Sequence, residues 1–345
     1  MIFLDCDYNN GCHEDILKRF TETNDEYTGT YGFDKFSSRA KEKIREACAD
    51  PLAEVFFLAG GTQTNSTVID CMLERWQGVV AAETGHINVH EAGAVEYTGH
   101  KVFALPSEDG KISPDALGAF LQGWHSDETR DHMAEPALVY ISFPTELGTL
   151  YSASELDRLY CICHSFGARL FVDGARLAYA LEAEGNDIDL PFLASHCDAF
   201  YIGGTKCGAL CGEAVVFPGG RAPEHFFTRI KQHGALLAKG RLVGLQFDTL
   251  FSDGLYSRIG RHADGLAVLI PSLFEKYGIG RVLTPSRTNQ QFLLVRKDAL
   301  EALKEEVAFE KWGPYDDEYD FCRFVTSWAT KRQDIESLES VLRGI

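Results

Sequence analysis

Two short segments place a charged side chain directly after an apolar run, which is where ligands bind in open α/β sheets. In the first, Asp173 follows Phe171 and Val172, and Arg176 comes three residues later. A carboxylate at this position can pair with a protonated ring nitrogen, and the arginine fork suits a ligand carboxylate. A structural Asp–Arg pair at the end of a strand is the alternative that the residues leave open.

The second segment holds Lys206 between Gly203-Gly204-Thr205 and Cys207-Gly208. Lysines usually lie on solvated loops, but the glycines on both sides and the apolar flanks favour a lysine held in a cleft. Desolvation in a cleft lowers the pKa of a lysine and produces a neutral amine nucleophile. The segment therefore indicates a reactive lysine close to a buried strand.

A third segment, Gly60-Gly61-Thr62-Gln63-Thr64-Asn65, follows the apolar run 55–58 and opens a predicted helix. Backbone amides at the glycines, the hydroxyl of Thr62 and the dipole of the helix suit one phosphate group. A glycine turn with a threonine cap is the alternative. The segment lacks the GxxxxGK[ST] pattern, which excludes a P-loop here.

His86 and His90 lie one helical turn apart in Thr84-Gly85-His86-Ile87-Asn88-Val89-His90-Glu91, so a zinc site has to be considered. The HExxH pattern is absent because Asn88 stands between the histidines, and no CxxC pair accompanies them. We therefore predict no metal site. Our interpretation is that His86 stacks on a flat ring and that His90 is structural.

Arg323 interrupts an apolar run, Phe321-Cys322-Arg323-Phe324-Val325-Thr326. Burying a guanidinium without a partner is costly, so we expect a ligand carboxylate beside it; an outward-facing strand position is the alternative. A reactive lysine, an aspartate for a ring nitrogen, a phosphate cradle and carboxylate-binding arginines are the groups that pyridoxal phosphate (PLP) catalysis needs. The residues therefore predict PLP as the cofactor.

The elements that must position these residues alternate between short apolar β-rich runs and amphipathic helical stretches. This alternation is typical of a mixed or parallel sheet covered by helices. Apolar spacing predicts helices over 64–76, with Trp76 on the buried side, and over 154–166. Strands are predicted at 78–83, 101–105, 137–142, 169–173, 199–203 and 213–217.

The sequence changes in character after Gly219, with long helical stretches to about residue 277. Two strand-like runs follow, over 292–296 and 321–328, and a last helix starts near 331. We predict an N-terminal arm over 1–20, a large cofactor domain over 21–245 and a small α+β domain over 246–345.

The composition restricts the partners and the location. A net charge of −18 repels polyanions, so we expect neither nucleic acid nor an anionic membrane as a partner. The chain has no run of about 18 apolar residues and no signal-peptide pattern at its start. Its ten cysteines are scattered without the spacing of a disulfide framework, which favours the reducing cytoplasm.

The chain resembles the low-specificity L-threonine aldolases, a family of fold-type I PLP enzymes. The resemblance covers nearly the whole length. It rests on TYGFD (30–34), GGTQTN (60–65), TGHINVHEAGA (84–94), HMAEPALVYISFPTELGTLYS (132–152), FVDGARL (171–177), FYIGGTKCGALCGEAVVF (200–217), KQHGALLAKGR (231–241), NQQF (289–292) and RFVTSWAT (323–330).

This resemblance implies a role for individual residues. It implies Lys206 as the residue that binds PLP covalently, with Asp173 on the ring nitrogen, Gly61 and Thr62 on the phosphate and His86 over the ring. His132 resembles the second active-site histidine of the family, with His125 as a nearby competitor. The family binds the substrate carboxylate with arginines, and it assembles as tetramers with sites between subunits. The residues implied at the carboxylate or from a neighbouring subunit are Arg176, Arg323, Tyr31, Lys231 and Lys239.

One position departs from the family pattern. Many relatives begin with a Ser-Asp pair whose serine contacts the substrate carboxylate, whereas this chain has Cys6-Asp7. The resemblance therefore places Cys6 at the substrate, without the serine hydroxyl.

The activity implied is the retro-aldol cleavage of a β-hydroxy-α-amino acid, L-threonine or L-allo-threonine, to glycine and an aldehyde. The base for the β-hydroxyl proton is then His86 or a water molecule held by His132. The alternatives are a PLP-dependent β-eliminating lyase that releases pyruvate and ammonia, a zinc hydrolase, and a binding protein on a PLP scaffold.

Overall fold

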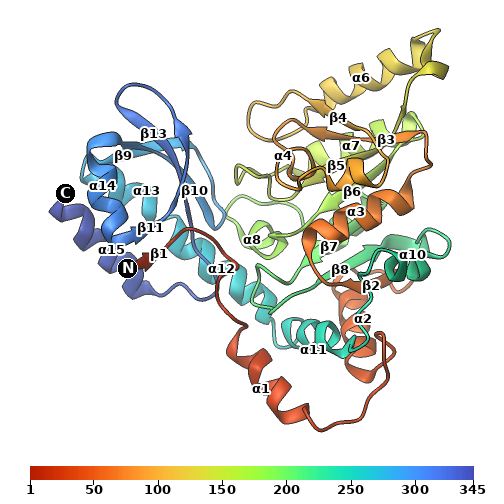
Figure 1. Ribbon diagram of the computed structural model, residues 1–345, viewed down its shortest axis with the longest axis horizontal. Helices are drawn as coiled ribbons and strands as arrows, with labels where there is room; N and C mark the ends of the chain where they lie inside the picture. Colours follow the sequence, from red (N-terminus) through yellow and green to blue (C-terminus); the bar gives the residue numbers. More distant parts are fainter.

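The computed structural model describes residues 1–345 and has a large sheet covered by helices and a smaller sheet beside it (Figure 1). The large sheet has seven strands in the order β2-β8-β7-β6-β5-β3-β4. The pairs from β7 to β4 are parallel, and β8 is antiparallel to both β7 and β2. The predicted mixed, mostly parallel sheet is confirmed, and its strands are β2 (Glu54–Leu58), β3 (Gln77–Ala82), β4 (Val102–Leu105), β5 (Glu135–Ser142), β6 (Arg169–Asp173), β7 (Ala199–Gly203) and β8 (Glu213–Phe217).

The apolar runs form central strands because both faces of this sheet are covered. Alternate residues of β7 enter two different cores: Phe200 and Ile202 pack into one, Ala199 and Tyr201 into the other. The helices of the first 200 residues are α1 (Glu14–Thr23), α2 (Lys35–Ala47), α3 (Gly61–Met72), α4 (His86–Val89), α5 (Ala94–Tyr97), α6 (Pro114–Ser126), η1 (Arg130–His132), α7 (Ala153–Ser165), α8 (Leu177–Glu182) and α9 (Leu190–Ser195).

The helix predicted over 64–76 starts earlier and ends earlier in the structure. Helix α3 ends at Met72 because Leu73 takes an extended backbone, with φ −117° and ψ 148°. Trp76 therefore leaves the helix, and its side chain is exposed rather than buried. The helix predicted over 154–166 is confirmed as α7 within one residue at each end.

The smaller sheet is antiparallel, with strand order β12-β13-β10-β9, and it has its own core of 17 buried residues. It confirms the predicted small C-terminal domain. Its strands are β9 (Gly280–Thr284), β10 (Gln290–Arg296), β12 (Glu310–Pro314) and β13 (Tyr319–Val325). The helices that follow the last strand of the large sheet are η2 (Pro218–Gly220), α10 (Phe226–Gln232), α11 (Arg241–Leu250), α12 (Leu255–Ala267), α13 (Ile270–Lys276), α14 (Lys297–Glu306) and α15 (Arg332–Gly344).

The first residues of the chain belong to this smaller body. Strand β1 (Ile2–Phe3) pairs in parallel with β11 (Val307–Ala308), and Leu4 is buried in the small core. The predicted division between residues 245 and 246 falls inside α11, a helix that packs against α2. The division into an arm, a large domain and a small domain at those boundaries stays a prediction.

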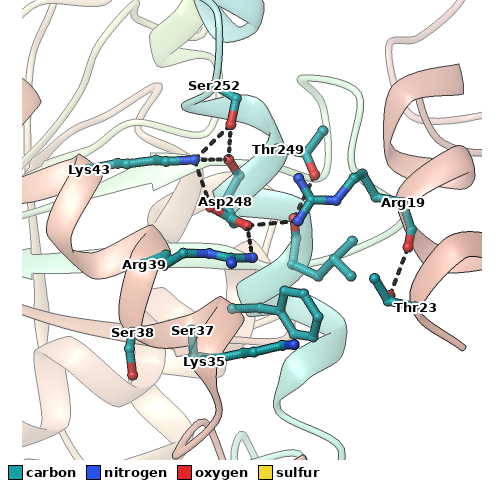
Figure 2. Close-up of polar contacts among 12 residues, drawn as sticks. Arg19, Thr23, Lys35, Ser37, Ser38, Arg39, Lys43, Asp248, Thr249 and Ser252 are labelled. Atoms are coloured by element: carbon teal, nitrogen blue, oxygen red, sulfur yellow. Dashed lines mark hydrogen bonds and ion pairs between the residues drawn. The ribbon is translucent and has the colours of Figure 1, made fainter. Parts of the chain in front are cut away.

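A buried aspartate fastens the N-terminal helices to α11. Figure 2 shows Asp248 facing Arg19 from α1 and both Arg39 and Lys43 from α2. The N···O distances are 3.0, 2.8 and 2.6 Å, and the Asp248 side chain is 1% exposed. The N-terminal segment thus begins at β1 beside the small sheet and passes Arg176, which follows β6, at Asp7. It then continues into α1 and α2, which Asp248 holds against α11.

Candidate active site

A cavity opens at the carboxyl ends of β5, β6 and β7, where the topology of an open sheet places ligands. Six of the residues predicted to act together line it: Gly61, Thr62, His86, Asp173, Arg176 and Lys206. An adjoining cavity shares Lys206, His86 and Arg176 with it and adds Arg323 from the small sheet. The two cavities form one cleft between the two sheets.

Asp173 ends β6 and is held by donors on both of its oxygens. Oδ2 accepts hydrogen bonds from the Tyr140 hydroxyl at 2.6 Å and from Asn65 Nδ2 at 2.9 Å, and Oδ1 accepts one from the Ala175 amide. Burial raises the pKa of this carboxyl, but the nearby His86 ring and the donated hydrogen bonds outweigh burial and lower it. Asp173 is therefore an anion at neutral pH and suits a protonated ring nitrogen.

Lys206 follows β7 in a turn that only glycine can build. A Cβ atom at Gly204 would lie 2.5 Å from the Gly212 carbonyl oxygen, and one at Gly203 would lie 2.2 Å from that of Ala175. Burial and the charge of Arg176 lower the pKa of the Lys206 ammonium, although Asp7 and Asp173 act in the opposite direction. The turn thus presents an amine that loses its proton more readily than a surface lysine.

Helix α3 begins at Gly61 beside the same cavity. The first amides of a helix lack carbonyl partners within it, so those of Gly61 and Thr62 are available to an anion. The Thr205 hydroxyl also lines the cavity, but its one proton is donated to Glu213 Oε1 at 2.8 Å. The two amides at the start of α3 fit one phosphate at the end of the cleft.

His86 belongs to a network that ends at Asp173. Its Nδ1 lies 2.9 Å from Glu91 Oε1, and the same oxygen accepts a hydrogen bond from Asn65 Nδ2 at 2.8 Å. Since Asn65 also binds Asp173, Glu91 fixes the imidazole relative to that carboxylate. The ring of His90 lies 5.6 Å from that of His86, and no group of three His, Cys, Asp or Glu side chains has the arrangement of metal ligands.

The structure pairs Arg176 with Asp7, a partner that the sequence did not indicate. Nε and Nη2 of Arg176 lie 2.7 and 3.0 Å from the two oxygens of Asp7, whose Oδ2 also accepts from Asn289 at 2.9 Å. The structural pair considered for Arg176 therefore exists, but with Asp7 instead of Asp173. Cys6, next to Asp7, is half-buried and does not line the cleft.

Arg323 projects from β13 into the substrate side of the cleft. Its Nη1 donates to Gln290 at 2.9 Å and its Nη2 lies 2.7 Å from Glu310, while Nε is buried without a partner. Burial and the charge of Arg176 both lower the pKa of the Arg323 guanidinium. Arg176, which follows β6, and Arg323, on β13, thus face the same cleft. Their positive charges repel each other, and an anion bound between them would relieve that repulsion.

The cleft is also lined by two glutamates that the sequence analysis did not select. The half-buried Glu146 follows β5, and the buried Glu213 opens β8, where it accepts from the Gly204 amide and the Thr205 hydroxyl. Burial raises the pKa of Glu213 to about 7. Glu146 lies in the motif TELGT and Glu213 in GEAVVF. Each is a carboxyl group next to an apolar run, and this pattern could have indicated a residue of the site.

Besides Cys6, five predicted residues do not line the cleft of this chain. His132 lies exposed in η1, ahead of β5, whereas the cleft lies beyond the other end of that eight-residue strand, about 26 Å away. His125 stacks on Phe166, with ring centroids 5.2 Å apart. Within one chain the prediction that His132 or His125 joins the site is therefore wrong. Tyr31 and Lys231 contact each other outside the cleft, the ammonium 4.6 Å from the ring centroid, and Lys239 does not line it either.

The fold and this cleft define a fold-type I PLP-dependent enzyme. Lys206 suits covalent attachment of the cofactor, Asp173 suits its ring nitrogen, and the start of α3 suits its phosphate. The family model described as "Beta-eliminating lyase" matches residues 21–240. The chain belongs to this family of lyases.

Three relatives add detail. The chain is 30% identical to the low specificity L-threonine aldolase of a Pseudomonas species (strain NCIMB 10558), over 99% of this chain and 97% of that one. It is 37% identical to the solved threonine aldolase of Leishmania major, with a TM-score of 0.96 and coverage of 100% and 99%. A PLP-bound C-S lyase from Staphylococcus hominis is 12% identical, with a TM-score of 0.69 over 98% and 88% of the two chains; it shares the fold.

Proposed function

We propose that the protein cleaves β-hydroxy-α-amino acids such as L-threonine and L-allo-threonine to glycine and an aldehyde. The observation that carries this proposal is the full-length similarity to two threonine aldolases, one of them with the same fold at a TM-score of 0.96. The cleft adds support from chemistry, because it combines a reactive lysine with two arginines suited to an amino-acid carboxylate.

The cofactor side of the cleft would hold PLP through residues of the large sheet. Lys206 would bind it covalently, Asp173 would keep its ring nitrogen protonated, and the amides of Gly61 and Thr62 would donate to its phosphate. His86, held by Glu91, would contact its ring. The chemistry that the bound group would supply is a sink for the electron pair released when a bond to Cα breaks.

The substrate side would orient the amino acid. Arg176 and Arg323 bind its carboxylate from opposite sheets, and this contact sets which bond of Cα stands perpendicular to the cofactor ring. Asp7 holds two nitrogens of Arg176 and leaves Nη1 free for the substrate. The reaction also needs a base for the β-hydroxyl proton, for which the sequence predicts His86 or a water molecule held by His132.

We also propose a homotetramer with sites between subunits. His132, Tyr31, Lys231 and Lys239 lie outside their own cleft, so a contribution from them would have to reach the cleft of another copy. No helix combines the length and the apolar content needed to span a bilayer. All ten cysteines are free thiols, which supports a location in the reducing cytoplasm.

The test compares products from purified protein. Threonine should yield glycine and acetaldehyde, whereas a β-eliminating lyase would release ammonia together with 2-oxobutyrate from threonine or pyruvate from serine. Lys206→Ala should lose both this activity and the absorbance of the covalently bound cofactor near the visible edge. A Lys206→Ala variant that stays yellow and active would refute the proposal, and the exposed Lys18→Ala is the matched control.

A further inference from the structure

Glu146 is a carboxylate in the cleft with one oxygen that no group of the chain engages. Its Oε1 accepts two hydrogen bonds, from the Ser142 hydroxyl at 2.5 Å and from the His86 backbone amide at 2.9 Å. Its Oε2 accepts none from the chain and is not sealed from the cleft. One oxygen is therefore anchored, and the other is open to a ligand.

The other carboxylates of the cleft are already engaged. Asp173 is bound at both oxygens, and so is Glu213. Glu91 uses Oε1 for His86 and Asn65, and its Oε2 is buried. Glu310 Oε2 is paired with Arg323 at 2.7 Å and also accepts from Trp312 Nε1, so the guanidinium balances the charge of this carboxylate. Of the carboxylates in the cleft, Glu146 is therefore the one with a free oxygen and no arginine partner.

Glu146 also lies in the correct half of the cleft. It lines the substrate side together with Lys206, which marks the position of the amine, and with Arg176 and Arg323. It is tied to the backbone of His86, the residue placed over the ring. A β-substituent that points away from the arginines would therefore meet Glu146 and His86.

Building on the proposed function, we infer that Glu146 is the base that removes the β-hydroxyl proton. The O–H bond of the substrate breaks as Glu146 Oε2 takes the proton, and the oxygen forms the C=O bond of the aldehyde. The Cα–Cβ bond breaks, and its electron pair passes to the bound cofactor. Because the overall reaction only moves one proton from the β-oxygen to Cα, Glu146 then releases its proton and needs no further reactant.

The surroundings of Glu146 are compatible with this role. Burial raises the pKa of its carboxyl, and the charge of Asp173 acts in the same direction, while the Ser142 hydroxyl and the His86 ring oppose them. A raised pKa makes the carboxylate a better proton acceptor than an exposed glutamate.

The experiment separates β-hydroxyl chemistry from binding at Cα. Glu146→Gln keeps the shape and should lower kcat for threonine cleavage by about 100-fold or more. Glycine has no β-hydroxyl, so its dissociation constant, read from the absorbance of the bound cofactor, should stay within about twofold of wild type. Glu135→Gln, at the start of β5 and so at the opposite end of that strand from Glu146, is the control and should change neither value.

Two results would overturn the assignment: threonine cleavage by Glu146→Gln at the wild-type rate, or a glycine affinity that falls together with kcat, which would indicate a structural role. Threonine cleavage by the wild-type enzyme is measured first. Its absence would overturn the proposed function itself, whereas an active wild type with an unimpaired Glu146→Gln would overturn only the role of Glu146.

Discussion

Replacing Asp248 with asparagine should destabilise the fold by removing the anion that three cations share. Removing one partner of a buried ion pair costs about 3–5 kcal/mol, because the remaining charge stays desolvated. Arg19, Arg39 and Lys43 are 30, 45 and 31% exposed, so water screens them and the loss should lie near 3 kcal/mol. In a domain of about 200 residues this corresponds to a fall in Tm of roughly 6–12 °C.

Thermal unfolding followed by circular dichroism measures this shift, with the exposed Asp253→Asn as control. The difference between wild type and Asp248→Asn should shrink in acid. Burial raises the pKa of Asp248, but the hydrogen bonds from Lys43 and Arg39 outweigh it and lower the pKa. The unfolded chain therefore binds the proton first, and this stabilisation is complete above the unfolded pKa near ~4 and lost as the pH falls through the folded one. A Tm within about 2 °C of the control at pH 7 would refute the reasoning.

Two further predictions concern the cleft. Asp7→Asn should raise KM for threonine about tenfold or more, because Arg176 loses a charged partner worth roughly 1.5–3 kcal/mol. Steady-state kinetics measures this, with Asp5→Asn as the control. An unchanged KM would show that Asp7 does not position Arg176. Gly204→Ala should weaken PLP binding, because its Cβ would meet the Gly212 carbonyl oxygen at 2.5 Å and displace the Lys206 turn. Absorbance titration with PLP measures the affinity, the exposed Gly123→Ala is the control because an added Cβ there meets nothing within 4 Å, and wild-type affinity in Gly204→Ala would contradict the close-contact argument.

The elements of the large sheet could be predicted because each buried strand is a short apolar run between turn residues. The strands ending at Asp173 and Gly203 begin and end where the sequence placed them, so the positions of Asp173, Arg176 and Lys206 at the carboxyl edge followed from the topology. Strand β1 has two residues and pairs with β11 some 300 positions away, so no local periodicity could indicate it.

The side chains that the sequence missed are those whose partners are distant. Asp7 acquires its role from Arg176, which lies 169 positions away, and nothing in the local sequence indicates that contact. Glu146 was not selected from the sequence because histidine is the more common general base. His132, in the same motif, was therefore predicted to hold the water molecule that acts as base. Strand β5 separates the two residues, which the motif alone could not reveal.

The pairing of β1 with β11 affects the order in which a ribosome can complete the site. Residues 2–4 find their partners only when residues 307–308 and 325 have been synthesised, because Leu4 bonds with Ala308 and Val325. Until then, Asp7 cannot be held against Arg176, although every strand of the large sheet is already made. A nascent chain that has folded its cofactor domain should therefore bind PLP before it can bind an amino acid. Completion of the small C-terminal sheet, through Val325, would be the step that converts it into a working enzyme.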